Sequence, residues 1–174
     1  MNKEDILKII KKSDIRSPVP IEYLNKLENE FNVLFPEDFK FFYSQISNGM
    51  RVSPNRRDEH ELGSIEDIFK LLHEKEKKSK TTLLDKPFPF QKAYIWEDDY
   101  EQDALSRMKS VRYGNIEIGD IYCSESWHLI LNGSSYGTMW GFTQFGIAPC
   151  HLTFIQWFKL WYLNKTIKLD INDN

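Results

Sequence analysis

A run of 33 residues, from residue 126 to residue 158, contains no Asp, Glu, Lys or Arg. It is the feature that most constrains the fold, because all 49 charged side chains (23 basic, 26 acidic) lie in the other 141 positions. A membrane-spanning helix needs about 20 mostly apolar residues in succession. Polar and turn-forming residues interrupt the run every few positions: Asn132, Gly133, Ser134, Ser135, Gly137, Thr138, Gly141, Thr143, Gln144, Gly146 and Pro149. The run therefore predicts short strands joined by turns, and no membrane segment.

An acidic stretch directly precedes the charge-free run. Between Glu97 and Glu125 there are eight acidic and three basic residues, a local net charge of −5, whereas the whole chain carries −3. Five of these acids lie close together, and we call them the acidic segment: Glu97, Asp98, Asp99, Glu101 and Asp103. A mildly acidic chain has no general attraction to nucleic acid or to an anionic membrane. The sequence therefore predicts neither as a direct partner.

Length and cysteine content favour one domain in a reducing compartment. A domain of about 150 residues buries roughly 70% of its unfolded surface, enough for a core without disulfides or metals. Cys123 and Cys150 are too few for a disulfide framework. Residues 1–13 lack the apolar stretch of about 7–15 residues that a signal peptide has. We therefore expect a cytoplasmic protein with two reduced thiols, either a monomer or a weak homodimer.

The first half of the chain predicts helices. Apolar residues recur at helical spacing in four segments, 3–12, 21–31, 36–47 and 64–80. Pro20 and Pro36 suit helix starts, and Ser64 suits an N-cap. Asn48-Gly49 suits a helix end. Residues 50–62 and 81–90 are predicted to be a loop and a connector.

The second half predicts strands at 93–96, 116–122, 126–131 and 137–143, and then a helix over 153–164. Alternation places Trp127 and Leu129 on one face of their strand and His128 and Ile130 on the other. The order of elements predicts an α+β fold, with a mainly antiparallel sheet of about four to six strands. We expect helices packed on one side of the sheet and a closing C-terminal helix.

Three regions are expected along the chain. Residues 1–16 are predicted to form an N-terminal helical extension and residues 17–164 a single domain. Residues 165–174 are predicted to be a polar tail, in which residues 168–174 fray.

Residues 21–49, which read IEYLNKLENEFNVLFPEDFKFFYSQISNG, resemble the opening of SUKH-superfamily (Smi/Knr-type) domains. That family has a helix with a Leu-Glu pair, here Leu27-Glu28. A Leu-Pro-x-Asp/Glu-Tyr/Phe step follows, here residues 35–39 with Phe35 in place of the leucine, and then a helix ending in Asn-Gly. Residues 114–123 and 127–133 also look similar. The resemblance spans about residues 17–164 and contains no catalytic signature.

The resemblance implies an intracellular binding domain. Bacterial members are commonly immunity proteins that bind and neutralise polymorphic toxins, often nucleases. Fungal members act as interaction scaffolds in cell-wall and signalling regulation. Many members have an acidic His-Glu pair after the third strand, but Trp140-Gly141-Phe142 occupies that region here, so no role transfers from that pair.

Three interpretations of the acidic segment remain open. A run of charges is most often a solvated loop. It can also be a docking surface for a basic partner, because a nuclease needs cationic groups to hold phosphates and an acidic surface can occupy them. A divalent-metal site is the third interpretation, although the spacing lacks the glycine and the final glutamate of a Ca²⁺ loop.

Cys123, His128, Cys150 and His151 raise the question of zinc binding or thiol catalysis. No Cys-x-x-Cys pair is present, and such pairs are usual in structural zinc sites. We therefore predict buried cysteines, and a hydrogen-bonded sheet residue at His128 rather than a general base. No catalytic residue, metal ligand or cofactor is predicted. Lys75, Lys77, Lys78 and Lys80 are expected to form a solvated helix end.

The aromatic residues complete the predicted contact surface. Trp157 and Trp161 are expected in helix–sheet packing, whereas Trp127 and Trp140 are expected on a solvent-facing sheet surface, where tryptophan favours binding hot spots. The predicted partner-binding residues are Glu97, Asp98, Asp99, Glu101, Asp103, Glu125, Trp127 and Trp140.

The sequence favours an immunity protein that occludes the active site of a cognate toxin domain with a basic surface. The alternative is an intracellular regulatory scaffold of the same fold. A third hypothesis is a hydrolase or transferase, which a deep pocket lined by His128 and a cysteine would favour.

Overall fold

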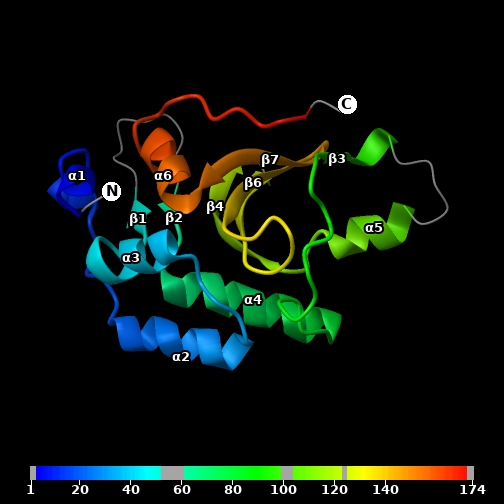
Figure 1. Ribbon diagram of the computed structural model, residues 1–174, viewed down its shortest axis with the longest axis horizontal. Coiled ribbons are helices and arrows are strands. Elements are labelled where there is room, and N and C mark those ends of the chain that lie inside the picture. The colour runs from blue at the N-terminus through cyan, green and yellow to red at the C-terminus, as the bar shows by residue number, and fades with distance from the viewer. Residues whose placement is uncertain (1–2, 52–60, 99–103, 123–124, 172–174) are drawn as a thin grey trace.

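A computed structural model describes residues 3–51, 61–98, 104–122 and 125–171 (Figure 1). Six α-helices lie within them: α1 (Lys3–Leu7), α2 (Ile21–Phe31), α3 (Glu37–Gln45), α4 (Ile65–Ser79), α5 (Ala104–Ser110) and α6 (Phe154–Tyr162). Two 3₁₀ turns are η1 (Lys12–Asp14) and η2 (Trp96–Asp98). None of the helices in these ranges is long and apolar enough to cross a membrane.

Seven strands form one antiparallel sheet in the order β1-β2-β4-β5-β6-β7-β3. The long strands at its centre are β4 (Asn115–Tyr122), β5 (Glu125–Ile130), β6 (Thr138–Thr143) and β7 (Gly146–Thr153). Two-residue strands border them: β1 (Met50–Arg51), β2 (Glu61–Leu62) and β3 (Tyr94–Ile95). The predicted α+β fold, with its antiparallel sheet and C-terminal helix, is confirmed. The sheet has seven strands because β7 was not predicted, and because β1 and β2 form the two ends of residues 50–62, which were predicted to be a loop throughout.

The two faces of the sheet are covered differently. Trp127, Leu129 and Met139 point into the main core, which the helices cover. The opposite face carries Ile130 and Trp140 and belongs to a smaller cluster with Phe88 and Ile147. Figure 1 shows α4 and α2 beneath the sheet and the segment between α4 and β3 running along its side. The prediction of helices on one side therefore holds, but a connector without regular structure closes the other face.

The residues that carry the SUKH resemblance hold elements together. The Glu28 carboxylate accepts a hydrogen bond from the Phe35 backbone N–H (2.7 Å) and pairs with Lys40 (2.9 Å). Asp38 accepts one from the N–H of Ile155 at the start of α6 (3.0 Å). A helix start has unpaired N–H groups, so Asp38 stabilises α6 from a distant part of the chain.

The Asn48-Gly49 pair does more than end α3. Asn48 Oδ1 accepts a hydrogen bond from the Ile65 N–H (2.8 Å), while Ser64, as predicted, caps α4 by accepting one from Asp67 N–H. A Cβ at Gly49 would lie 2.7 Å from the carbonyl oxygen of Leu62. Only glycine allows this close backbone approach between the end of α3 and β2.

The chain beyond the predicted domain packs against it at both ends. Ile6 is buried in the main core, and the Tyr162 hydroxyl of α6 accepts a hydrogen bond from Lys11 N–H (2.8 Å). The predicted helix over 3–12 is shorter, since it ends at Leu7 and η1 follows.

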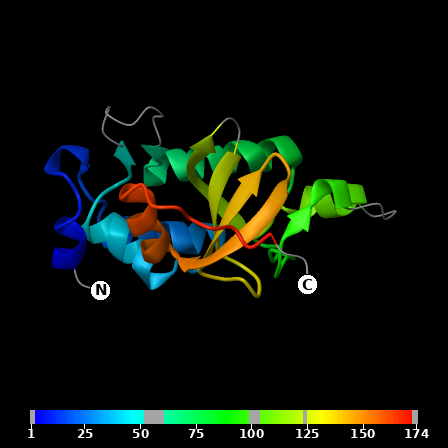
Figure 2. The same cartoon turned by 90° about the horizontal axis from the view of Figure 1, so that it is seen from above.

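At the other end, residues 165–171 cross over the sheet (Figure 2), where Asp170 N–H donates to the Pro149 carbonyl (2.8 Å). Leu169 packs on Gly141 because that residue has no side chain. Residues 168–171, which were expected to fray, therefore contact the sheet, and 172–174 lie outside the described residues.

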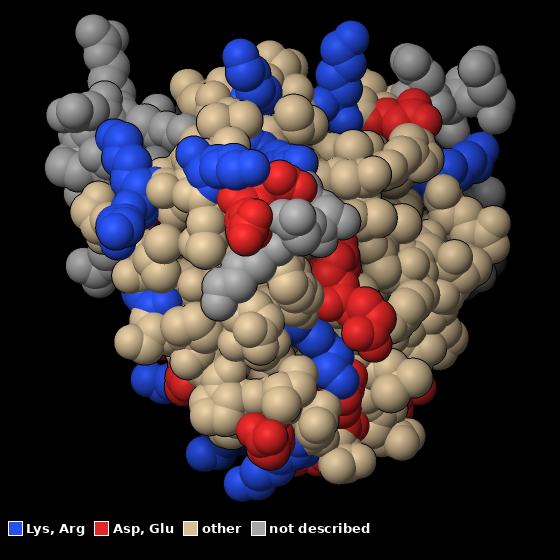
Figure 3. Space-filling view, turned by 60° about the vertical axis from the view of Figure 1, so that its left-hand side comes forward, with Lys and Arg blue, Asp and Glu red and all other residues tan. Residues whose placement is uncertain are grey.

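Acidic and basic side chains are interspersed over the face seen in Figure 3. Among the residues described there, no continuous basic surface forms, although direct nucleic-acid binding requires one. The charges on this face are those of an ordinary solvated surface.

Candidate functional site

The structure describes only the start of the acidic segment. Glu97 lies in η2 and its side chain is exposed, and Asp98 ends the same turn. Asp99, Glu101 and Asp103 lie outside the described residues.

The turn between β6 and β7 brings two of the predicted contact residues to one end of the sheet. The N–H of Trp96, next to Glu97, donates to the Phe145 carbonyl (2.9 Å). The N–H of Gln144 donates to Glu125 Oε1 (3.4 Å). Glu97 and Glu125 are 28 residues apart in sequence and yet flank the same turn.

A groove of about 600 Å³ opens beside this turn, between β7 and the C-terminal segment, and we call it the β7 groove. Its walls are mainly apolar: Ile95, Phe145, Ile147, Ala148, Ile167, Leu169 and Ile171, together with Glu125, Thr143 and Gly146. Phe145 is 57% exposed and Ile171 is 61% exposed. Neighbouring exposed apolar side chains are typical of interaction sites, so this groove is a candidate docking surface.

Trp127 and Trp140 do not belong to any exposed surface. Trp140 has no exposed area and packs on Phe88, with 4.8 Å between ring centroids. Trp127 is 6% exposed and packs on Trp157 of α6, with 5.7 Å between centroids. The expectation that both lie on a solvent-facing surface is therefore wrong. The alternation does place them on opposite faces, but each of those faces is covered.

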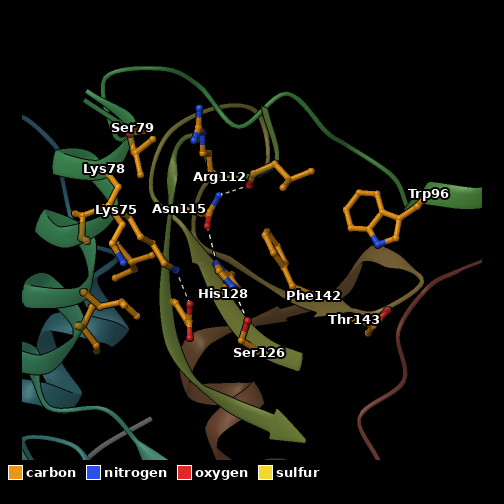
Figure 4. Close-up of a pocket in the computed structure, with 17 residues that line it drawn as sticks. Lys75, Lys78, Ser79, Trp96, Arg112, Asn115, Ser126, His128, Phe142 and Thr143 are labelled. Atoms are coloured by element: carbon orange, nitrogen blue, oxygen red, sulfur yellow. Dashed lines mark hydrogen bonds and ion pairs between the residues drawn. The ribbon is translucent and has the colours of Figure 1, made fainter. Parts of the chain in front are cut away.

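A second cavity, of about 540 Å³, lies between α4 and the sheet, and we call it the α4 pocket (Figure 4). Its apolar lining is Ile68, Leu71, Leu72, Leu83, Trp96, Val111, Ile116 and Phe142. Its polar and charged lining is Lys75, Lys78, Ser79, Arg112, Asn115, Glu117, Ser126, His128 and Thr143.

His128 forms a hydrogen-bonded chain in the wall of the α4 pocket. Its Nδ1 lies 2.7 Å from Asn115 Oδ1, and its Nε2 lies 2.8 Å from Ser126 Oγ. Asn115 Nδ2 donates to the carbonyls of Val111 and Tyr113 (both 2.8 Å), which fixes the orientation of the amide. Nδ1 must therefore carry the proton that Asn115 accepts, and Nε2 accepts the hydrogen bond that Ser126 donates.

The environment keeps the imidazole neutral. Burial lowers the pKa of His128 well below its ordinary value of 6.5, and the nearby Lys75 cation lowers it further. The ring also stacks on Phe142, with 3.7 Å between centroids and an interplanar angle of 11°. The prediction of a hydrogen-bonded sheet residue at position 128 is confirmed.

The order Asn115–His128–Ser126 resembles that of a hydrolase triad, but its chemistry is weaker. An amide stands where a carboxylate would stabilise the imidazolium, and a base with a strongly lowered pKa takes protons poorly at neutral pH. Acyl transfer also needs donors for an oxyanion. Ser126 pairs with Asp120 on β4 and Phe142 on β6, so the backbone around it is part of the sheet ladder. The hydrogen-bonded residues Asn115, His128 and Ser126 are therefore better suited to shaping the pocket than to catalysis.

Of the two cysteines the structure describes Cys150, which gives no sign of a reactive thiol. Cys150 is buried, its Sγ–H donates to the Met139 carbonyl (3.2 Å), and burial raises its pKa to about 11. Cys123 lies outside the described residues. His151 is exposed and pairs with Asp170 (3.0 Å). In the part of the chain that the structure describes, no three His, Cys, Asp or Glu residues gather as metal ligands.

Sequence reasoning missed both cavities. The i, i+2 spacing of Ser126 and His128 was a usable signal, because such residues share a strand face. Phe145, an aromatic residue in a turn, was another. Leu169 lines the β7 groove and Asn115 lines the α4 pocket only because of tertiary packing, so no local sequence signal indicated either role.

Comparisons with protein-family profiles, with curated proteins and with solved structures each return no match.

Proposed function

We propose that this chain is a cytoplasmic, non-enzymatic binding domain of the SUKH type that neutralises a cognate toxin domain by covering its active site. The β7 groove is the observation that carries the proposal, because its lining combines an apolar cavity of about 600 Å³ with Glu125, one of the predicted acidic contacts. The resemblance of residues 21–49 to SUKH domains supports the choice of an immunity protein.

The groove favours a partner with a basic surface and one protruding apolar side chain. Phe145, Ile171 and the groove walls would bury that side chain, and buried apolar anchors supply most of the binding energy at interfaces. Glu125 in the groove lining would attract the cationic groups around it, as would the exposed Glu97 beside Trp96, whose N–H bonds to the Phe145 carbonyl. Complementary charge mainly raises the association rate. A standard interface buries about 800 Å² per partner, more than the groove alone, so the acidic segment would extend the contact.

Co-expression with the product of the adjacent gene tests this proposal. We expect a stable complex and rescue of growth, and we expect F145A to weaken binding roughly tenfold, because truncated anchors typically cost more than 1 kcal/mol. L34A is the matched control, since Leu34 is 70% exposed and lies away from the groove.

Three outcomes separate the possibilities. Wild-type binding by F145A would remove the β7 groove from the contact, and no complex with unchanged toxicity would overturn the immunity function. A regulatory scaffold would instead show several weak interactors and no neighbouring toxin gene.

A further inference from the structure

The α4 pocket has the size and lining of a small-molecule site. Its volume of about 540 Å³ falls within the range of about 300–1,000 Å³ that ligand sites occupy. Apolar side chains from α4, β4 and β6 form most of its surface, and a few polar groups converge on it. The hydrogen bonds of His128 hold that wall in place before any ligand arrives.

Its charges are unbalanced. Three cations and one carboxylate line the pocket, and Lys75 pairs with Glu117. Lys78 and Arg112 have no carboxylate partner among the described residues. The lining therefore carries two cations without an acidic partner among the described residues. Lys78 is exposed, as expected for a solvated helix end, and Arg112 is exposed and lies 5.7 Å from the Tyr113 ring centroid.

The cations and the aromatic rings lie in different parts of the pocket. Figure 4 shows Lys78 and Arg112 around one end, and Phe142 and Trp96 toward the other. Ser126 donates its proton to His128, so its oxygen is left as an acceptor, and the neutral imidazole adds no positive charge to the pocket. A negative group is therefore favoured only near Lys78 and Arg112.

We propose that the α4 pocket binds a small organic anion with an apolar body. Its charged group lies against Lys78 and Arg112, and its body lies against Phe142, Trp96 and Leu71. This inference goes beyond the proposed function, because neither Lys78 nor Arg112 contributes to the β7 groove. It stands whether or not a toxin is the partner.

Octanoate is a suitable probe, with octanol, octylammonium and inorganic phosphate as comparisons. Titration calorimetry of the full chain should show saturable 1:1 binding of octanoate and at least tenfold weaker binding of the other three. K78Q/R112Q should weaken octanoate binding roughly tenfold, as expected for the loss of charge-assisted contacts. K77Q is the matched control, because Lys77 lies on the same helix with its side chain exposed and outside the pocket lining, and should bind octanoate as the wild type does.

Several results would overturn the proposal. No saturable binding of octanoate by the wild-type chain would do so, and octanol binding as tight as octanoate would show an apolar void without anion selectivity. If K77Q weakened octanoate binding as much as K78Q/R112Q does, binding would depend on the overall positive charge and not on the two cations that line the pocket. L71W, which fills the apolar part of the pocket, gives an independent check, because it should abolish binding while the melting temperature shows that the chain is folded. If K78Q/R112Q does not fold, the two single variants carry the test.

Discussion

At the scale of single residues, His128 links the pocket wall to stability. Both ring nitrogens have partners, one face of the ring stacks on Phe142, and the side chain is buried. A buried polar group that loses its partner costs about 1–3 kcal/mol, so this network stabilises the fold only while it is complete.

H128Q should lower the free energy of unfolding at pH 7.5 by about 2 kcal/mol, because stacking is lost and hydrogen bonds are disturbed. The pKa of His128 is lowered in the folded chain, so the unfolded chain binds more protons as the pH falls below 6.5. The contribution of neutral His128 to the free energy of unfolding is therefore complete above about pH 6.5. It is lost as the pH falls toward the pKa of the folded state, and the free energy of unfolding then changes by at most about 1.4 kcal/mol per pH unit. Urea unfolding from pH 7.5 to 5 should show the difference between wild type and H128Q shrinking.

The exposed His73 provides the comparison for this measurement. H73Q removes an exposed ion pair with Glu30 (3.4 Å) and a ring contact with Phe31, so it should change stability by less than about 1 kcal/mol. Parallel pH curves for wild type and H128Q would show that this ring does not titrate with folding.

At the scale of elements, sequence periodicity predicted five of the six helices in the described residues and the β4–β5–β6 strands, but neither α5 nor β7. Residues 146–150 are buried without interruption, so no polar alternation marks them as a strand, and Pro149 argues against one. The segment before β3 is the second case. Its prolines indicate a connector, yet Phe88 is buried in it and closes the face that alternation assigned to solvent. Both failures have one cause. Polar alternation along a strand identifies which side chains share a face of the sheet, but it does not show what covers that face, and it disappears where both faces are covered.

G146A tests how β7 holds β3. Gly146 pairs with Ile95, and an added Cβ would meet the Tyr94 carbonyl oxygen and lie 2.9 Å from Ile95 Cα. Backbone atoms cannot move aside as a flexible side chain does, so we expect a loss of about 2–3 kcal/mol and faster amide exchange at residues 94–97.

G137A is the control for G146A. Gly137 has a φ of +78°, but a Cβ there would have its nearest contact, Pro36 Cγ, at 3.8 Å. Only the left-handed backbone is strained, which costs about 1 kcal/mol. A smaller effect at Gly146 than at Gly137 would contradict the tight β3–β7 approach.

At the scale of the whole molecule, the segments predicted as an extension and a tail are parts of one packed unit. No local pattern indicated this packing, because Lys11 and Asp14 are typical surface residues and their partner Tyr162 lies about 150 positions away. The large sequence separation between contacting residues also explains why the candidate sites could not be predicted in full. Glu97 and Glu125 could be proposed as contacts from local charge alone, whereas the groove that Glu125 lines needs β7 and residues 167–171 in place.

Y162F tests whether the N-terminal segment folds with the rest of the chain. The Tyr162 hydroxyl accepts a hydrogen bond from Lys11 N–H and donates one to the buried Asp14 carboxylate (both 2.8 Å). Hydrogen bonds to charged groups are worth about 1.5–3 kcal/mol, and 1 kcal/mol shifts the melting temperature of a chain of this size by about 2–4 °C. We therefore expect a single calorimetric transition that is lower by roughly 3–12 °C. Y136F, at an exposed tyrosine, should leave it almost unchanged. An unchanged melting temperature in Y162F, with fast amide exchange confined to residues 3–16, would instead make that segment a separate extension, because its loss would then cost the main core nothing.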